Sequence, residues 1–240
     1  MPRREIPAFR EEVRGFCAPD PFNGPDGTYL IRSLYLDTRG LELFHANGRE
    51  AGERFKARVR GYPEAPGPKV FVEIKNRHGD VIRKTRAPLP RHGWAQQLRD
   101  FGSPDWAHPD LDAFLFKYHR YSLRPQVLVE YRREAWASRQ DDYARISIDG
   151  QVRCQPATEL SLEANPARWR AIDSPLPTWL GESTCVVELK WADVVPRWMM
   201  QLVRRLDLLR HAFSKYCYSM EALADEHYRD YRRSHSAFWS

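Results

Sequence analysis

The sequence contains no long hydrophobic run. None of its apolar stretches approaches the ~20 residues that a membrane-spanning helix needs, and residues 1–5 lack the apolar core of a signal peptide. We therefore expect a soluble, cytoplasmic protein. At 240 residues, 42% of them hydrophobic, the chain can bury one substantial core, so we expect a single domain over residues 1–240.

Closely spaced cysteines and histidines are also missing. The four cysteines lie far apart and form no C-x-x-C pair, which predicts free thiols in a reducing compartment. The eight histidines show no spacing typical of metal ligands, and His78 is expected in a turn. The sequence therefore offers no histidine or cysteine metal site.

Lysine is scarce, because only seven of the 38 basic residues are lysines. A lysine retained against this bias is informative, since a compact ammonium and a planar guanidinium recognise phosphate differently. Five of the seven fall in the charged segments described below: Lys56, Lys75, Lys84, Lys190 and Lys215. The formal net charge of +6 is modest, so the location of the charges matters more than their sum.

Residues 54 to 86 predict three consecutive strands with one strongly cationic face. Residues 54–60 alternate apolar and basic side chains, so a period-two strand places four cations together. In the next two strands, Glu73 and Lys75 share a face, as do Lys84 and Arg86. Like charges on one face repel unless a polyanion or interleaved carboxylates neutralise them, so this face is expected to meet a negative partner.

The rest of the chain alternates between strand and helix patterns. Further strands are expected at residues 29–37, 127–133, 145–149 and 185–191, which makes seven in all. Helices are expected at residues 3–17, 41–46, 91–101, 110–121 and 196–209, and from about residue 214. Residues 155–183 predict only an excursion that contains one helix. The sequence thus indicates an α+β fold dominated by antiparallel strands, with helices covering the apolar side of the sheet.

A half-exposed sheet is the simplest explanation for one alternating strand. Five strands that all carry charges on their polar faces favour a different explanation than a solvated face. The cations on these faces outnumber the carboxylates Glu73, Asp149 and Glu188. A sheet that closes into a barrel would place these groups around one lumen. A few carboxylates among many cations suit a metal and a triphosphate, since Mg²⁺ or Mn²⁺ completes its shell with phosphate and water.

An ordered set of short motifs resembles a known family. The motifs are Tyr29-x-Ile31-x-Ser33-Leu34-Tyr35-x-Asp37, Lys56-x-Arg58-x-Arg60-x-Tyr62, Glu73-x-Lys75, Lys84-x-Arg86, Tyr131-x-Arg133, Arg145-x-Ser147-x-Asp149, Glu188-x-Lys190 and Phe213-Ser214-Lys215-Tyr216. Together they resemble the VTC domain, the polyphosphate polymerase module of the vacuolar transporter chaperone complex, in the triphosphate tunnel metalloenzyme superfamily. The chain looks like a stand-alone bacterial member.

The resemblance implies an antiparallel eight-stranded β-barrel tunnel that uses Mn²⁺ or Mg²⁺ to move the terminal phosphate of ATP onto polyphosphate. It implies phosphate-handling catalytic roles for Lys75, Arg58, Arg60 and Lys215. It implies substrate binding by Lys56, Lys84, Arg86, Tyr131, Arg133, Arg145, Lys190 and Ser214. Ser214 and Lys215 have independent support, because a Ser-capped helix N-terminus attracts anions.

The resemblance also implies a metal ligand. Glu188 looks like that ligand, while Glu73 is either a second carboxylate at the metal or the partner of Lys75 and Arg58. Glu130 is out of phase with Tyr131 and is expected to point away from the lumen.

The chain departs from the family at its start. The family opens with a strand before the first helix, whereas this chain begins almost on that helix, so only seven of eight tunnel strands are expected. An open seam would expose two strand edges, and a reading frame truncated at its start is the favoured explanation.

Three functions stay open at this point. The first is polyphosphate synthesis from ATP, the second is hydrolysis by a triphosphatase or tripolyphosphatase, and the third is a non-catalytic polyanion-binding module. ATP and polyphosphate or triphosphate are the expected partners, and duplex nucleic acid is not expected because a tunnel is too narrow for it. A membrane-protein partner cannot be read from the sequence.

Overall fold

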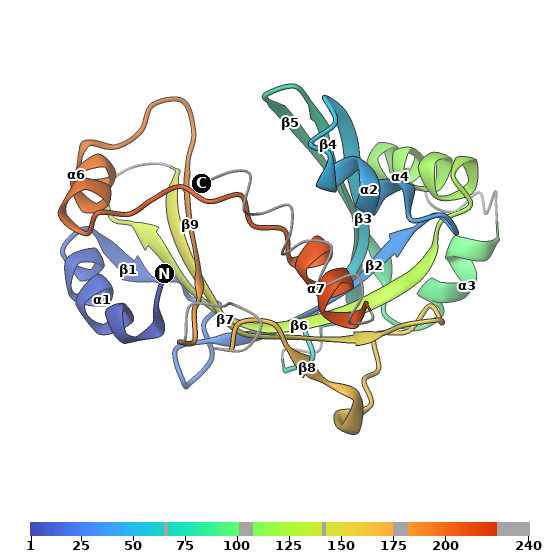
Figure 1. The fold of residues 1–240 in the computed structure, drawn as a ribbon, viewed down its shortest axis with the longest axis horizontal. Coiled ribbons are helices and arrows are strands. Elements are labelled where there is room, and N and C mark those ends of the chain that lie inside the picture. Colours follow the sequence, from blue (N-terminus) through green and yellow to red (C-terminus); the bar gives the residue numbers. More distant parts are fainter. Residues whose placement is uncertain (65–66, 101–107, 141–142, 175–181, 225–240) are drawn as a thin grey trace. The chain divides into compact units, whose positions relative to one another are not determined.

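The computed structural model describes residues 1–64, 67–100, 108–140, 143–174 and 182–224. Its strands are β1 (Cys17–Pro19), β2 (Tyr29–Asp37), β3 (Glu53–Gly61), β4 (Lys69–His78), β5 (Val81–Pro90), β6 (Arg124–Ser138), β7 (Ala144–Pro156), β8 (Arg170–Ala171) and β9 (Val186–Trp191). Its helices are α1 (Ile6–Arg14), α2 (Glu42–Gly48), α3 (Trp94–Arg99), α4 (Pro109–Arg120), α6 (Arg197–Arg205) and α7 (Lys215–Leu223), with short 3₁₀ turns at Arg3–Glu5 and Pro166–Arg168 (Figure 1). The α+β class is confirmed.

The chain divides into two compact units. Unit 1 comprises residues 1–31, 130–153 and 171–213, and unit 2 comprises residues 32–129, 154–170 and 214–240. Strands β2, β6, β7 and β8 contribute residues to both. Each unit has a hydrophobic core of its own, and the expected single domain stays a prediction.

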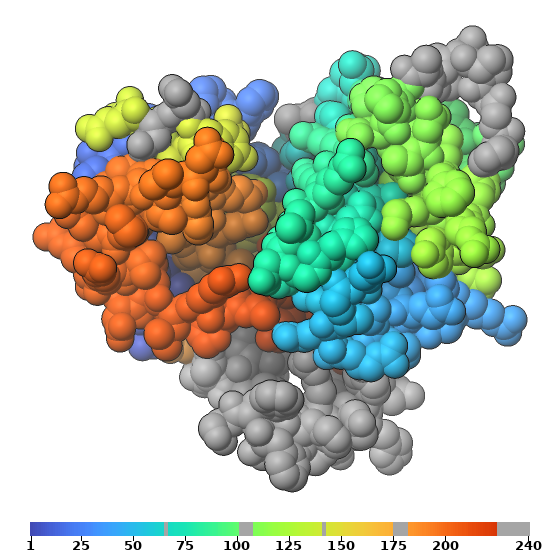
Figure 2. All heavy atoms as spheres, turned by 90° about the horizontal axis from the view of Figure 1, so that it is seen from above, coloured from blue at the N-terminus to red at the C-terminus, as the bar shows by residue number. Residues whose placement is uncertain are grey.

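The core of unit 2 lies between the β3–β5 strands and helices α3 and α4. Alternation along β3 sends Phe55, Ala57 and Val59 into this core. Trp94 of α3 and Phe114 of α4 pack against the same side of the sheet. Figure 2 shows the light-green atoms of α4 lying against the green atoms of β5. With one face of the strands buried in this way, their other face is left to the charged side chains.

The core of unit 1 forms around α1, α6 and the adjoining ends of the long strands. Phe9 and Val13 of α1 are fully buried, and Trp198 of α6 joins them. Residues 1–3 also run along residues 183–185, with an antiparallel bridge between Pro2 and Thr184. These contacts fix the helices beside β6, β7 and β9.

The sheet differs from the expected tunnel in two respects. It has nine strands rather than seven, because β1 and β8 are three and two residues long and too short to produce an alternating pattern. The strand order is β5-β4-β3-β2-β6-β7-β8, with β1 paired to β6 and β9 to β7. The described strands therefore form an open sheet, and the closed barrel that the resemblance implied is not formed by these pairings.

The helices begin and end close to the expected positions. The helix expected at residues 3–17 is shorter, since α1 ends at Arg14 and β1 follows it. The described part of residues 155–183 contains a 3₁₀ turn and β8, residues 175–181 lie outside the described residues, as does residue 101, and the helix expected in this segment stays a prediction. No helix of the described part of the chain is long and apolar enough to cross a membrane.

Candidate functional site

The polar face of strands β3, β4 and β5 carries its charges in register. Antiparallel pairing sets Lys56 opposite Lys75, and Lys75 opposite Lys84, which forms a lysine row across three strands. The next row along the strands consists of Arg58, Glu73 and Arg86. Directly opposed like charges destabilise a sheet, so the lysine row costs stability unless an anion lies near it. We call these two rows, together with Arg60, the cationic face.

Glu73 is the carboxylate at the centre of the cationic face. Its side chain is 2% exposed, and Arg58 donates to its Oε2 atom at 2.7 Å. Its Oε1 atom lies 3.1 Å from the Lys84 Nζ atom and within 3.7 Å of two further guanidiniums, those of Arg86 and Arg60. Burial favours the neutral acid, but Arg58, Arg60 and Lys84 outweigh it and hold the pKa of Glu73 well below its usual value. Glu73 is therefore ionised and acts as the counter-ion of four cations.

Aromatic side chains hold the arginines of the cationic face in place. The Tyr35 hydroxyl accepts a hydrogen bond from Arg58 at 3.0 Å, and Arg86 lies 3.8 Å from the centre of the Phe71 ring. Arg86 also donates to the Tyr62 hydroxyl at 3.4 Å. Cation–π contacts and these hydrogen bonds fix the direction of each guanidinium fork. The cations are thus preorganised toward one side of the sheet.

Lys56 joins the cationic face to the last helix. Its Nζ atom donates to the Ser214 Oγ atom at 2.9 Å, and the same Oγ atom caps α7 by accepting from the Cys217 backbone N–H. Burial, reinforced by the charge of Lys75, lowers the pKa of Lys56 to about 8. Lys56 is therefore a lysine that can change its charge near neutral pH.

A buried hydrogen bond anchors α7 beside β2. Asp37 is fully buried and accepts from the backbone N–H groups of Thr38, Leu43 and Phe44, which ties the start of α2 to β2. The Tyr216 hydroxyl donates to the same carboxylate at 2.5 Å, and its ring stacks on Tyr35. Burial and the charge of Asp37 raise the pKa of Tyr216 well above its usual value, so the hydroxyl keeps its proton. This anchor fixes the start of α7, and with it Ser214 and Lys215, in unit 2.

Unit 1 carries a second group of charged residues, on β6, β7 and β9. Arg133 forms a bidentate pair with Asp149, at 2.6 and 2.7 Å, and its pKa is raised because Tyr131 and Asp149 outweigh the effect of burial. Glu188 lies 3.2 Å from Lys190 and 3.8 Å from Arg133, and its side chain is 43% exposed. Glu188 is thus accessible, whereas Asp149 is buried and committed to Arg133.

The two other predicted residues of unit 1 are placed differently from each other. In the β7–β9 register, Arg145 lies opposite Lys190. Its side chain is exposed and lies 3.9 Å from Asp20. Tyr131 is only 1% exposed, and Arg133 lies 5.5 Å from its ring centre. The buried Tyr131 ring therefore packs against the Arg133 guanidinium.

The structure brings the predicted residues together in two sets. Unit 2 holds Lys56, Arg58, Arg60, Glu73, Lys75, Lys84, Arg86, Ser214 and Lys215, and unit 1 holds Tyr131, Arg133, Arg145, Glu188 and Lys190. Glu130 points away from this set, as expected, and pairs with Arg153 at 2.8 Å. Sequence reasoning assigned no role to Tyr35, Asp37 or Tyr62, although the shared phase of Tyr35 and Asp37 on β2 was the signal that could have found two of them.

Comparisons with known proteins identify the family of this chain. The family model of the VTC domain matches residues 1–224. The chain belongs to the VTC domain family. No curated protein sequence matches it. Membership of the VTC domain family supports a tunnel fold and a role in phosphoryl transfer. Tunnel-fold enzymes of this kind generally use divalent metal ions.

Two solved structures are similar to this VTC domain chain at low identity. One is a Bacillus halodurans protein described as an adenylate cyclase candidate, with 15% identity and a TM-score of 0.38; the match covers 60% of this chain and 66% of that one. The other is a Pyrococcus horikoshii OT3 protein with 11% identity and a TM-score of 0.37, covering 83% of this chain and 80% of that one. The VTC domain chain thus spans slightly less than two thirds of the Bacillus protein.

Proposed function

We propose that the chain is a metal-dependent phosphotransferase that moves the terminal phosphate of ATP onto a polyphosphate chain. The observation that carries this proposal is the lysine row beside the Arg58–Glu73–Arg86 row, because its repulsion is relieved by a bound polyanion. Family membership supports phosphoryl transfer. The choice of polyphosphate as the acceptor rests on the resemblance of the motifs to the polymerase module.

The cationic face suits the demands of phosphoryl transfer. The reaction asks a protein mainly to position the phosphates and to neutralise charge, and it needs no nucleophilic side chain. The fork of Arg86 can bind two phosphate oxygens, while Arg58, Lys75 and Lys84 supply positive charge beside it. Glu73 keeps these cations close together, so little reorganisation is needed when the phosphates bind.

The start of α7 adds directional contacts. The Ser214 hydroxyl caps the first turn of α7 and accepts a hydrogen bond from the Lys56 ammonium group. Such helix starts attract phosphate oxygens. We propose that Lys56, Ser214 and Lys215 orient one end of the bound phosphate chain.

The residues present fit a divalent ion that is held largely by its substrate. Among the described residues, no three His, Cys, Asp or Glu side chains gather into a protein-only metal site. Glu188 is accessible and can supply one carboxylate, as Mg²⁺ commonly requires when phosphates complete its shell. Glu73 fits the role of counter-ion better, because four cations surround it. When bound, the ion would neutralise charge on the transferred phosphate.

The proposal is tested by incubating the purified chain with ATP and Mn²⁺, with and without a short polyphosphate primer. Products are resolved by gel electrophoresis and ³¹P NMR. We expect lengthening polyphosphate together with ADP. Orthophosphate with ADP would instead identify a triphosphatase, and saturable tripolyphosphate binding without turnover would identify a binding module. Either of these results overturns the polymerase.

A pair of lysine variants tests the location of the site. Lys75→Ala should raise the KM for ATP about tenfold, which corresponds to one lost charged contact. Lys117→Ala removes an equivalent charge from α4, where the ammonium lies over the Phe55 ring on the opposite side of β3, and should leave KM unchanged. Equal effects of the two variants would rule out the cationic face as the binding site.

A further inference from the structure

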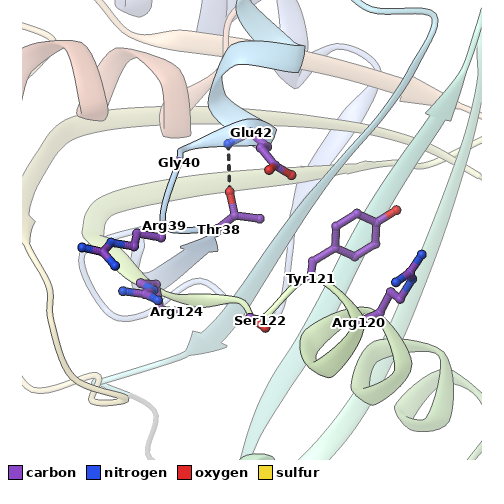
Figure 3. Close-up of a pocket in the computed structure, with 8 residues that line it drawn as sticks. All are labelled: Thr38, Arg39, Gly40, Glu42, Arg120, Tyr121, Ser122 and Arg124. Atoms are coloured by element: carbon purple, nitrogen blue, oxygen red, sulfur yellow. Dashed lines mark hydrogen bonds between the residues drawn. The ribbon is translucent and has the colours of Figure 1, made fainter.

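Unit 2 has a surface pocket that none of the residues predicted for the transfer site lines. Its volume is about 320 Å³, and it forms where the segment after β2 meets the end of α4 and the start of β6. Its lining includes Thr38, Arg39, Glu42, Arg120, Tyr121 and Arg124 (Figure 3). The volume is at the lower end of the range of about 300–1,000 Å³ typical of small-molecule sites.

The pocket has an excess of positive charge that no described residue neutralises by an ion pair. Three guanidiniums line it against the single carboxylate of Glu42. Neither Glu42 nor any of the three arginines forms an ion pair with another residue that the structure describes. By contrast, Arg58 and Arg133 each have a buried carboxylate partner. Arginine forks without a partner are suited to capture an anion from solution.

The pocket is separate from the cationic face. The Tyr121 ring packs on Phe55 with a centre-to-centre distance of 5.0 Å. Phe55 projects from the side of β3 opposite to Lys56, because the two residues are adjacent in one strand. The Lys117 ammonium adds a further positive charge 5.9 Å from the Tyr121 ring. An anion in this pocket would therefore contact none of the residues assigned to the transfer reaction.

We infer that this pocket is a second binding site for an oligophosphate anion of about tripolyphosphate size. Figure 3 shows Arg39 and Arg124 at one end of the pocket, and Tyr121 and Arg120 at the other. Guanidiniums at both ends suit an elongated anion with charge along its length, which each fork can bind through two oxygens. The choice of phosphate over another polyanion rests on the proposed function, whereas the presence of an anion site rests on the pocket alone.

The test is isothermal titration of the full chain with tripolyphosphate. We expect two binding sites in the wild-type chain and one in the Arg39→Ala/Arg124→Ala double variant, since each lost arginine weakens its site about tenfold or more. Arg49→Ala/Arg99→Ala removes the same charge from exposed positions outside the pocket and should keep both sites. Lys75→Ala/Lys84→Ala should lose the other site and keep this one.

Two results would overturn the inference. One is an Arg39→Ala/Arg124→Ala variant that binds tripolyphosphate as the Arg49→Ala/Arg99→Ala control does. The other is equally tight binding of poly-L-glutamate at this pocket, which would indicate a general polyanion surface. Urea unfolding of every variant verifies the fold. None of these readouts depends on ATP turnover, so failure of the proposed reaction leaves the result intact.

Discussion

Lys56 is a residue of the cationic face whose charge is sensitive to pH. Its pKa of about 8 is set by burial and by the neighbouring Lys75. A bound phosphate chain stabilises the ammonium form and must raise this pKa. Binding therefore takes up protons near pH 8, and the uptake fades below about pH 6.5, where Lys56 is already charged.

The proton uptake can be measured by titrating tripolyphosphate at pH 8 in buffers of different ionisation enthalpy. We expect roughly half a proton per anion bound at the cationic face, which follows from the pKa of about 8. Lys56→Arg keeps the charge but cannot titrate in this range, so the uptake should vanish while binding persists. An unchanged uptake in Lys56→Arg would show that another group takes up the proton.

Glu73 can be distinguished as a counter-ion or a metal ligand by removing its charge. Glu73→Gln leaves four cations without their carboxylate and should lower the free energy of unfolding by about 3 kcal/mol. Because the depressed pKa of Glu73 stabilises the fold above its unfolded pKa of about 4.3, this loss should be present at pH 7 and shrink as the pH falls below 4. If Glu73 is the counter-ion, metal-free tripolyphosphate should restore much of the stability, because it replaces the missing negative charge.

Glu130→Gln provides the matched control for this experiment. Glu130 is as deeply buried and pairs with Arg153, but it lies outside the cationic face. Urea unfolding should show that the Glu130→Gln chain is also destabilised and gains no more from tripolyphosphate than the wild-type chain. Equal gains in both variants would argue against the counter-ion role.

At the scale of elements, a buried hydrogen bond helps to hold α7 in place. Tyr216→Phe removes the hydroxyl that Asp37 accepts and should lower the free energy of unfolding by about 2 kcal/mol. Amide exchange along α7 should accelerate as well. Because the pKa of Tyr216 is raised, both effects should be equal at pH 7 and pH 9. Tyr143→Phe, on a ring that is 47% exposed, serves as the control, and identical behaviour of the two variants would contradict the anchor.

The charged strands were predictable because their signal is local. Period-two alternation placed Lys56, Lys75 and Lys84 on one polar face, and the observed register sets them directly opposite one another. The anchor of α7 was not predictable in this way, since Asp37 and Tyr216 are separated by 179 residues. Alternation shows which side of a strand a residue occupies, but only tertiary packing decides what it meets there.

The arginine pocket shows the same limit more strongly. Arg39 and Arg124 lie at the ends of two strands and Arg120 ends a helix, so no periodic pattern connects them. The two short strands were missed for a related reason, because two or three residues carry no alternation. Sequence patterns could therefore identify the cationic face but not the pocket, which depends on where chain ends and turns meet.

At the scale of the whole molecule, each unit contains two buried free thiols. Cys17 and Cys185 belong to unit 1, and Cys154 and Cys217 belong to unit 2. Burial raises the pKa of Cys154 and Cys185 to about 11, so they react slowly while the unit that contains them stays folded. Pulsed alkylation in mild urea thus reports the opening of each unit separately.

We expect tripolyphosphate to slow the alkylation of Cys154 and Cys217, because its proposed sites lie in unit 2. At a concentration 100 times the Kd, binding adds about 2.7 kcal/mol to the free energy of opening, which is a roughly 100-fold slower reaction. Combining Lys75→Ala/Lys84→Ala with Arg39→Ala/Arg124→Ala removes both proposed sites of unit 2 and should lose most of this protection. Unprotected unit 2 thiols would contradict binding there. Protection that extends to Cys17 and Cys185 would mean that the two units open together, because a ligand stabilises only the folded structure to which its binding is coupled.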